Sequence, residues 1–529
     1  MSSLRIACVS SLALFVTIAV GCGGDETGGD TSSGPGGTGG STTSTGGTGG
    51  TGGTGGTGGT GGTGGTGGTG GTGGTGGMGG AGGAGAGGGG GAGGGGGMMG
   101  SGTPDAYFFG DYVTNNVFNL GVYDGATQAV TTLTPSGLDG GDDLNSMAIS
   151  SDGSQLALAG VHMAADPSIL NVYATSDFST ATTLASAANA TNTGATIREL
   201  KISPDGMWVA FTADFDLAGA DAAYVVPTDG TAAPKQVSPT PPANGDVKEL
   251  VWAANSQDLV YAGDVVTDNI DGIWSVDTAA ATPTAVELVP AAMLNASQDV
   301  STTIIQIDAL AKVYFTADID IDSLFRLYRV DLDGNNLEQV PGTGLTNGGG
   351  ETGVGTWAIS PDGLRLAFSS MSPDADLSQV YTMDIANPGG VAAVSAVQTA
   401  PISGETRGPE FFQPISWSPD QTMLAVAADW EVMTGDLDNE AGLFILPASG
   451  TAGGVRITKP ATTDANQDAY SGVFATDGSR VFIHGDLVGA NEDDVCVTTD
   501  FTTADQDATT LSVVAAPNNG DVRELLVVP

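Results

Sequence analysis

The sequence predicts an all-β protein: an eight-bladed β-propeller, closed by a composite blade and preceded by a disordered glycine-rich linker. Three observations lead to this prediction. A strand–turn–strand unit recurs with turn anchors 50 to 58 residues apart, at positions 152, 205, 255, 309, 362, 420 and 477. Each unit contains up to four strand-like segments, the number found in a propeller blade. The two ends of the repeat region supply complementary parts of one more unit.

The clearest repeat is a tight turn between two apolar strands. Ser-Pro-Asp-Gly at 203–206 is followed by Val-Ala-Phe at 209–211, and the same turn at 360–363 is followed by Leu-Ala-Phe at 366–368. In such a turn proline presets φ, aspartate caps the backbone and glycine adopts a positive φ. The copies at the anchors 255 and 309 are degenerate. If either of them is not a blade, the ring has seven blades instead of eight.

The eighth blade is predicted from the two ends of the repeat region. Gly-Asp-Val-Arg-Glu-Leu at 520–525 nearly copies the first strand Gly-Asp-Val-Lys-Glu-Leu at 245–250, but no turn follows it. Residues 106–111 and 119–124 have the pattern of a second and a third strand without a first strand before them. Pairing the last strand with these segments closes the ring and leaves no open sheet edge.

The Ser-Pro-Asp-Gly turn with its following Leu/Val-Ala-Phe resembles the repeats of TolB-type propellers, also called WD40-like PD40 repeats. The resemblance covers residues 103–529 and implies a TolB-like propeller domain there. TolB proteins pair a six-bladed propeller with an N-terminal α/β domain, and related propellers accompany the hydrolase domain of prolyl oligopeptidases. The resemblance therefore implies the blade type, and it implies no particular function.

Residues 1–21 are predicted to be a lipoprotein signal peptide. Arg5 precedes an apolar run over 6–20, and Ala-Val-Gly-Cys at 19–22 resembles a bacterial lipobox. The resemblance implies cleavage before Cys22 and acylation of that residue, and Gly23 after it implies sorting to the outer membrane. An ordinary secretory signal is the alternative. We expect an outer-membrane lipoprotein that faces the periplasm or the cell surface and touches the membrane only through its lipid.

Residues 22–102 are predicted to form a disordered tether behind the lipidated cysteine. The unit Thr-Gly-Gly occurs eleven times between residues 45 and 77, and Gly/Ala-rich sequence follows. Such a chain loses too much conformational entropy on ordering to fold by itself. A flexible segment of this length spans roughly 50 Å. It would hold the propeller away from the membrane.

The charge balance excludes one class of partner. The chain has 14 Lys and Arg against 59 Asp and Glu, a formal net charge of −45. Such a surface repels the phosphates of nucleic acids, so nucleic-acid binding is not expected. Cys496 is the only cysteine after residue 22, and the chain has two histidines, so zinc sites rich in His and Cys are not expected either.

Acidic residues are predicted to gather on one face of the ring. The position nine residues after an anchor is Asp in most repeats, and Val161 and Met371 are the exceptions; the aspartates are Asp111, Asp214, Asp264, Asp318, Asp429 and Asp486. More acids follow in the same loops, at Asp216, Asp221, Asp268, Asp271, Asp320, Asp322, Asp374, Asp376, Asp436, Asp438, Asp493 and Asp494. Three interpretations remain open: loop capping with general solubility, a Ca²⁺ site, and a surface for a basic partner. The first is favoured.

The best calcium candidate is the alternating triplet Asp318, Asp320 and Asp322, because hard cations take several carboxylate oxygens from one loop. The triplet does not continue as an EF-hand, since Ser323 and Arg329 replace the required Gly and Glu. No other cofactor is expected.

The central channel of the ring, which the first strands line, and the two histidines are further candidate sites. Arg198-Glu199, Lys248-Glu249 and Arg523-Glu524 recur in first strands, and a mutually paired structural ladder is favoured over a ligand site. His162 and His484 fall in different blades and no Gly-x-Ser-x-Gly elbow is present, so a catalytic triad has no support. Cys496 occupies an aromatic position of a third strand and is expected to be a buried packing residue.

Together these features favour a non-enzymatic binding or scaffold module of the cell envelope, expected to be monomeric. The expected partner is an envelope protein or glycan of unknown identity. The alternative is a calcium-dependent propeller enzyme, a hydrolase or a lyase.

Overall fold

A computed structural model describes residues of the predicted propeller domain. The predicted signal peptide, Cys22 and the tether lie outside the described residues. Those described are 104–114, 117–133, 135, 143–161, 168–192, 194–294, 298–347, 350–371, 378–395, 415–428, 441–449, 454–458, 469–487, 493–504, 506, 512–515 and 522–529.

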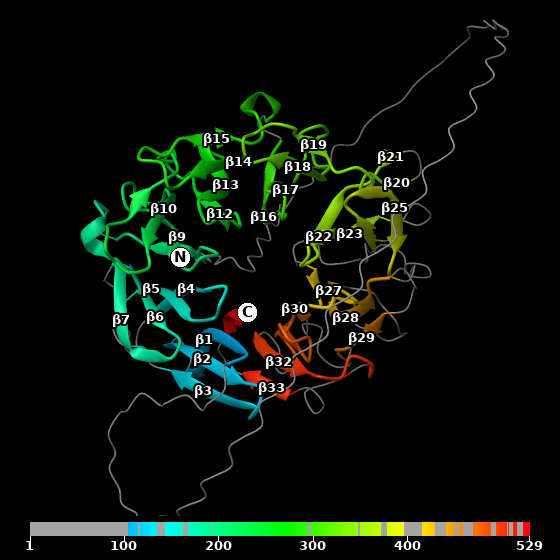
Figure 1. Cartoon of the computed structure of the whole chain (residues 1–529), viewed down its shortest axis with the longest axis horizontal. Coiled ribbons are helices and arrows are strands. Elements are labelled where there is room, and N and C mark those ends of the chain that lie inside the picture. The colour runs from blue at the N-terminus through cyan, green and yellow to red at the C-terminus, as the bar shows by residue number, and fades with distance from the viewer. Residues whose placement is uncertain are drawn as a thin grey trace, which may run out of the picture. The chain divides into compact units, whose positions relative to one another are not determined.

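Eight four-stranded antiparallel sheets surround a common centre, and the predicted eight-bladed propeller is thereby confirmed (Figure 1). In each of the first seven blades the strands follow one another in the order of the chain. The degenerate copies at 255 and 309 both belong to complete blades, so the alternative of seven blades is wrong.

The first four blades have the following strands. Blade 1 contains β4 Asp143–Ile149, β5 Gln155–Val161, β6 Ser168–Ala174 and β7 Asp177–Ala185. Blade 2 contains β8 Ile197–Ile202, β9 Trp208–Ala213, β10 Ala222–Pro227 and β11 Lys235–Gln236. Blade 3 contains β12 Val247–Trp252, β13 Asp258–Thr267, β14 Ile270–Asp277 and β15 Ala285–Glu287. Blade 4 contains β16 Val300–Ile307, β17 Lys312–Ala317, β18 Arg326–Asp331 and β19 Glu338–Gln339.

The remaining blades complete the ring. Blade 5 contains β22 Val354–Ile359, β23 Arg365–Met371, β24 Ser378–Asp384 and β25 Asn387–Ala393. Blade 6 contains β26 Ser416–Trp417, β27 Met423–Ala428, β28 Gly442–Pro447 and β29 Val455–Arg456. Blade 7 contains β30 Ala469–Phe474, β31 Val481–Gly485, β32 Asp494–Thr498 and β33 Ser512–Ala515. The closing blade contains β34 Val522–Val527, β1 Ala106–Thr114, β2 Val117–Asp124 and β3 Ala129–Leu133. A two-stranded ribbon, β20 Thr346–Asn347 and β21 Gly350–Glu351, lies between blades 4 and 5 in the sequence.

The closing blade joins the two ends of the described chain, as predicted. β34 pairs with β1 in antiparallel register, with Phe108 opposite Leu525 and Phe109 opposite Glu524. Successive residues of β1 point to opposite faces of the sheet. Phe108 packs in a core cluster with Phe482 of blade 7, whereas Phe109 packs in another with residues of blade 1. Both phenylalanines are fully buried, and each contributes about 1.5–3 kcal/mol to the hydrophobic free energy of folding.

The turns between first and second strands form as the repeat predicts. The Ser203 hydroxyl donates to Asp205 (2.6 Å) and accepts the backbone N–H of Trp208 (3.0 Å), and Gly206 has a φ of 71°. In the degenerate copies Ser256 and Ala311 adopt the positive φ themselves, at 58° and 61°. These turns lie on one face of the ring, here called the turn face, and the loops after the second strands lie on the other, the loop face.

Helices are short in the described part of the chain. They are the 3₁₀ turns η1 Ala187–Asn189 and η2 Ala291–Met293. Among the described residues there is no helix with the length and hydropathy needed to cross a membrane.

Candidate functional site

The aspartates nine residues after the anchors cap two backbone segments at once. The Asp264 carboxylate accepts the N–H of Asp246, just before the first strand of its blade, at 2.7 Å, and the N–H of Asn269 in the following loop at 3.0 Å. The same pair of bonds joins Asp214 to Thr196 and Gly219, and Asp318 to Asp299 and Ser323. All three carboxylates are more than nine-tenths buried. The loop-capping interpretation is confirmed for these three residues.

The other members of this series are less fully described. Asp486 is 1% exposed at the equivalent place in blade 7. Asp429 lies outside the described residues, as do the side chains of Asp111, Val161 and Met371. Of the further loop acids, Asp374, Asp376, Asp436 and Asp438 also lie outside them.

A second layer of aspartates links neighbouring blades. Asp246 of blade 3 accepts the N–H of Asp221 of blade 2 at 2.9 Å. Asp299 of blade 4 accepts the N–H of Asp271 of blade 3 at 3.0 Å. Together with the capping aspartates they form a continuous acidic arc across blades 2, 3 and 4, here called the acidic arc. Its members are Asp214, Asp221, Asp246, Asp264, Asp271, Asp299 and Asp318.

Two basic side chains meet the acidic arc. Arg198 Nη1 lies 2.6 Å from Asp221 Oδ2, and Lys248 Nζ lies 2.7 Å from Asp271 Oδ1 and 3.6 Å from Asp264 Oδ1. The predicted ladder between neighbouring Arg/Lys and Glu residues is therefore wrong for this pair of cations. Their partners are aspartates of the same blade: Asp221 lies just before β10, and Asp271 lies at the start of β14.

Burial and mutual repulsion change the acidity of the arc. Burial raises the pKa of Asp221 to about 7, although the guanidinium of Arg198 opposes this shift. Burial also raises the pKa values of Asp246, Asp271 and Asp299, and neighbouring carboxylates add to each increase. Ionisation of Asp221, Asp246, Asp271 and Asp299 is therefore more costly than ionisation of a carboxyl in water.

The calcium triplet does not converge on one point. Asp318 caps the backbone as described above, and Asp320 accepts the Tyr328 hydroxyl at 2.6 Å. Asp322 accepts the hydroxyl of the adjacent Ser323 at 3.2 Å. Within the described ranges, His, Cys, Asp and Glu side chains form no group of three that could hold a metal ion. The calcium hypothesis stays a prediction.

The channel acids surround one lysine. Lys201 Nζ lies 2.8 Å from Glu199 Oε1 and 3.7 Å from Glu249 Oε1. Burial lowers the pKa of Lys201, but the two glutamates outweigh it and keep the ammonium protonated. Glu524 accepts the N–H of Met147 at 3.1 Å and so ties the closing strand to blade 1. The channel charges are thus engaged in structural contacts.

The histidine and the cysteine that the structure describes are also structural. His484 Nε2 lies 3.0 Å from the carbonyl oxygen of Val522 at the start of the closing strand. His162 lies outside the described residues. Cys496 is fully buried, as predicted, and burial raises the pKa of its thiol to about 12. A thiol with so high a pKa stays protonated at neutral pH and is therefore a poor nucleophile.

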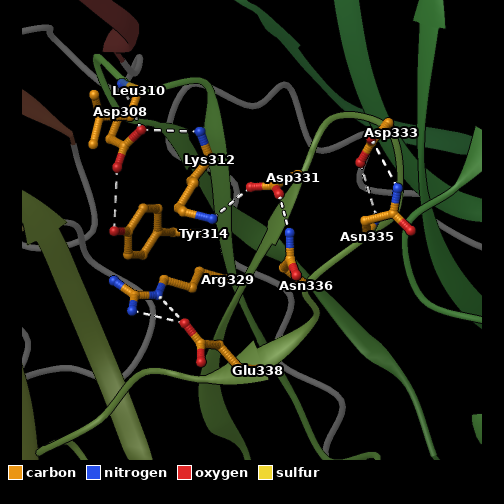
Figure 2. Close-up of polar contacts among 10 residues, drawn as sticks. All are labelled: Asp308, Leu310, Lys312, Tyr314, Arg329, Asp331, Asp333, Asn335, Asn336 and Glu338. Carbon is orange, nitrogen blue, oxygen red and sulfur yellow. Dashed lines mark hydrogen bonds and ion pairs between the residues drawn. The ribbon is translucent and has the colours of Figure 1, made fainter.

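Blade 4 carries a polar network near the turn face (Figure 2). Asp308 accepts the backbone N–H groups of Leu310 and Lys312 at 2.8 and 2.9 Å, and so replaces both the serine and the aspartate of the regular turn. The Lys312 ammonium lies 2.5 Å from Asp331. The other pairs drawn are Tyr314 with Asp308, Arg329 with Glu338, Asn336 with Asp331, and Asn335 with Asp333. The contacts of Asp308 stabilise the degenerate turn, and those of Lys312 and Arg329 join β17 to β18 and β18 to β19.

A cavity of about 300 Å³ lies among first strands at the turn-face end of the channel. Its walls include Trp417, whose indole N–H donates to the carbonyl of Ala358 at 3.1 Å. Gln306 also lines it and accepts the N–H of Ile359 at 2.7 Å. The polar groups of Trp417 and Gln306 are thus used in joining neighbouring blades.

A second cavity, of about 230 Å³, lies at the outer edge between blade 7 and the closing blade. It is lined mainly by polar side chains, among them Arg480, Gln128 and Thr499. Sequence reasoning missed it, because residues from 123 to 128 and from 480 to 506 meet only when the ring closes. Asp246 and Asp299 were missed as well, although the repeated Gly-Asp-Val sequence before Lys248 was a signal for the former.

Known proteins resemble this chain in fold. No family model and no curated protein sequence matches it. Solved structures that resemble it include a putative TolB from Agrobacterium tumefaciens, with 17% identity over 55% of this chain and 89% of that one and a TM-score of 0.32. Dipeptidyl peptidase 4 of Porphyromonas gingivalis has 12% identity over 65% of this chain and 50% of that one, with a TM-score of 0.45. An oligogalacturonate lyase in complex with manganese has 15% identity over 72% of this chain and 96% of that one, with a TM-score of 0.42.

These neighbours differ in activity, and this chain spans half the length of the peptidase. At sequence identities this low, the similarity bears on the fold alone and not on activity. What the chain itself shows is an eight-bladed, all-β propeller closed by its own ends.

Proposed function

We propose that this chain is a lipid-anchored propeller outside the cytoplasm that acts as a non-enzymatic binding or scaffold module. The observation that carries the proposal is the use of the loop-face carboxylates. In Asp214, Asp264 and Asp318, both carboxylate oxygens accept hydrogen bonds from backbone N–H groups. Groups used in this way hold loops in a fixed geometry, which suits a platform that presents a surface.

The N-terminal sequence supports the location. The lipobox-like Ala-Val-Gly-Cys at 19–22 would place a lipid on Cys22, and the Thr-Gly-Gly tether would follow it. More than one acyl chain gives stable anchoring, and a flexible tether of this composition reaches roughly 50 Å. The propeller would then sample partners near the outer membrane, on its periplasmic or outer side.

The charge supports a restricted set of partners. A formal charge of −45 disfavours polyanions and favours neutral or basic surfaces. An envelope protein with a basic patch or a neutral envelope glycan fits this requirement.

The anchor is tested with Cys22→Ser. We expect the variant to leave the membrane fraction, while its melting temperature equals that of the unchanged chain, because residue 22 lies outside the propeller. Sedimentation of the serine variant with membranes after a high-salt wash would contradict lipidation.

The binding role is tested with the same soluble variant as bait in envelope extract. The matched control is Cys22→Ser without residues 520–529, in which the ring is open. We expect partners that the closed ring captures and the open ring does not. Capture that is equal for both baits, or conversion of a captured glycan or peptide to products, would overturn the proposal and favour an enzyme.

A further inference from the structure

The outer cavity between blade 7 and the closing blade has the features of a ligand site. It has a volume of about 230 Å³, and its lining includes Tyr123, Gln128, Arg480, Thr499, Asp500 and Gln506. Its walls come from the turn after β2 and from both ends of the β31–β32 region. A small, mainly polar hollow with convergent side chains is the usual form of a site for a small molecule.

The back wall of the cavity is held rigidly. Gln506 is 4% exposed, and its amide nitrogen donates to the carbonyl oxygens of Asp500 and Thr503 at 2.8 and 2.9 Å. Its amide oxygen accepts the Thr498 hydroxyl at 2.9 Å. The Asp500 carboxylate in turn accepts the N–H of Thr502 at 2.9 Å. These groups satisfy one another, so the wall keeps its shape without a ligand.

Arg480, which lines the cavity, is held by two neighbours. Its Nη1 lies 3.3 Å from Asp105 Oδ2, and its Nε donates to the Ser479 hydroxyl at 3.2 Å. The guanidinium lies against the backbone of Gly125, where any side chain would collide with it. No acceptor for Nη2 is present in the described part of the chain, so these two N–H groups are available to a ligand.

Three more polar groups that line the cavity are unused. The hydroxyl groups of Tyr123 and Thr499 and the amide of Gln128 form no side-chain hydrogen bond with the described residues. The Tyr123 ring is fixed against Phe482 at a centroid distance of 5.6 Å, and Gln128 is held with a φ of 54°. Burial raises the pKa of Tyr123, so its hydroxyl stays protonated at neutral pH. Together with Arg480, these groups offer both donors and acceptors.

The charges around the cavity select against ions. Asp105, Asp124 and Asp500 outnumber Arg480, so a free anion meets net negative charge. A cation meets the guanidinium of Arg480, which lines the cavity. A neutral molecule with several hydroxyl groups avoids both penalties and can use donors and acceptors alike. The volume lies just below the range of about 300–1,000 Å³ found for small-molecule sites, which limits the occupant to a single ring.

We propose that this cavity binds one neutral sugar ring, the terminal residue of a glycan. The assignment rests on the proposed binding role and gives it a ligand class. It places recognition at the outer edge of the ring, away from the acidic arc and from the channel.

The test uses the full chain and ligand-observed nuclear magnetic resonance or calorimetry. The probes are methyl glycosides of glucose, galactose, mannose and N-acetylglucosamine, with the methyl glycosides of galacturonic acid (an anion) and glucosamine (a cation) as charged counterparts. We expect at least one neutral glycoside to bind and both charged probes to bind more weakly. A glycoside that binds better than the matching free sugar would indicate a chain terminus as the natural source.

Three variants locate the site. Tyr123→Phe keeps the ring contact and removes the hydroxyl, Thr499→Val keeps the shape, and Gln128→Gly removes the amide at a φ that glycine adopts freely. Each should lower affinity by about three- to tenfold, the effect of one neutral hydrogen bond. The control is Asn244→Gly, a substitution at a φ of 68° far from the cavity in sequence, which should leave affinity unchanged.

The inference fails if no neutral glycoside binds, if only a charged probe binds, or if all three variants bind like the unchanged chain. If the Cys22→Ser bait still captures an envelope partner in these cases, the proposed binding role is retained and only the assignment of a sugar ligand is wrong. Binding of a glycoside followed by its cleavage would leave the cavity standing and overturn the non-enzymatic role.

Discussion

The two faces of the propeller use aspartate in opposite ways. On the turn face, Asp152, Asp362 and Asp420 are exposed and accept hydrogen bonds from residues two positions away in the sequence. On the loop face, Asp264 and its equivalents are buried and join segments about 18 residues apart in sequence. The same residue type therefore closes a local turn on one face and fastens tertiary structure on the other.

Asp221, a member of the acidic arc on the loop face, differs in acidity from the aspartates of the turn face. Hydroxyl and backbone donors lower the pKa of Asp152 to about 2, led by the Ser150 hydroxyl, and hydrogen bonds also lower the pKa values of Asp362 and Asp420. Burial raises the pKa of Asp221 to about 7. Where water solvates the carboxylate, donors stabilise its charge at no cost; where water is excluded, removal from solvent outweighs the donors. The difference teaches that sequence position alone does not fix the ionisation of an aspartate.

The largest expected effect comes from opening the ring on which both groups depend. Deleting residues 520–529 removes β34, exposes β1 and uncovers Phe108 and Phe109. We expect loss of cooperative folding, or a loss of stability of several kcal/mol, in thermal and denaturant unfolding. Deleting residues 45–77 of the tether is the control and should leave the melting temperature unchanged. A ring that melts normally without residues 520–529 would show that the last strand is dispensable.

Removing one carboxylate from each face shows how much each kind of aspartate contributes to the free energy of unfolding. Asp264→Ala leaves the N–H groups of Asp246 and Asn269 without their carboxylate acceptor and should cost about 2–4 kcal/mol. Asp205→Ala removes an exposed turn contact and should cost about 1 kcal/mol. Asp264→Asn, which keeps one acceptor oxygen, should fall between them. The measurement is urea unfolding of the three variants, and equal costs for the two alanine variants would remove the distinction between fastening and turn-closing aspartates.

The pH dependence has opposite signs on the two faces. A carboxyl whose pKa is raised by folding stabilises the protein below its unfolded pKa, and this stability is lost as pH rises toward the folded value. For Asp221 the window runs from about pH 4 to about pH 7, with an upper limit of about 4 kcal/mol. We therefore expect the melting temperature to fall from pH 5 to pH 8, and to fall less in Asp221→Asn.

The control for this experiment is Asp229→Asn on the turn face. Hydrogen bonds from Thr231 lower the pKa of Asp229, so its contribution is present above the unfolded pKa and is lost as pH falls below about 4. The variant should match the unchanged chain between pH 5 and pH 8. If Asp221→Asn also runs parallel to the unchanged chain there, Asp221 does not titrate in that window.

The smallest expected effect is the response to calcium. Because Asp318, Asp320 and Asp322 contact different partners, we expect millimolar Ca²⁺ and Na⁺ of equal ionic strength to raise the melting temperature equally, by screening of surface charge. An excess in Ca²⁺ that disappears in Asp320→Asn with Asp322→Asn would instead place the ion at this loop. Binding at a hundredfold excess over its dissociation constant would add about 2.7 kcal/mol.

Local chemistry explains why the fold was predictable. The Ser-x-Asp turns are closed by residues a few positions apart, so the pattern at 203–206 predicts the bonds that Ser203 and Asp205 make. The closing blade was predictable because residues 520–525 copy residues 245–250. The degenerate turn at 309 was harder to predict, since Asp308 alone accepts the bonds that a serine and an aspartate accept in the regular turn, and the turn is shorter.

The sequence by itself determined the repeat, the composite closure and the buried place of Cys496, because each depends on local periodicity or on a repeated segment. The structure decided for eight blades against seven, because the degenerate copies at 255 and 309 form complete sheets. Only the tertiary structure decided the partners of Arg198 and Lys248, the links from Asp246 and Asp299 to the preceding blades, and the cavity beside Arg480. Those contacts join segments whose distance is set by how the blades pack. The tertiary structure also decided the raised pKa values of Asp221, Asp246, Asp271 and Asp299, because their main cause is burial, which depends on what covers each carboxylate.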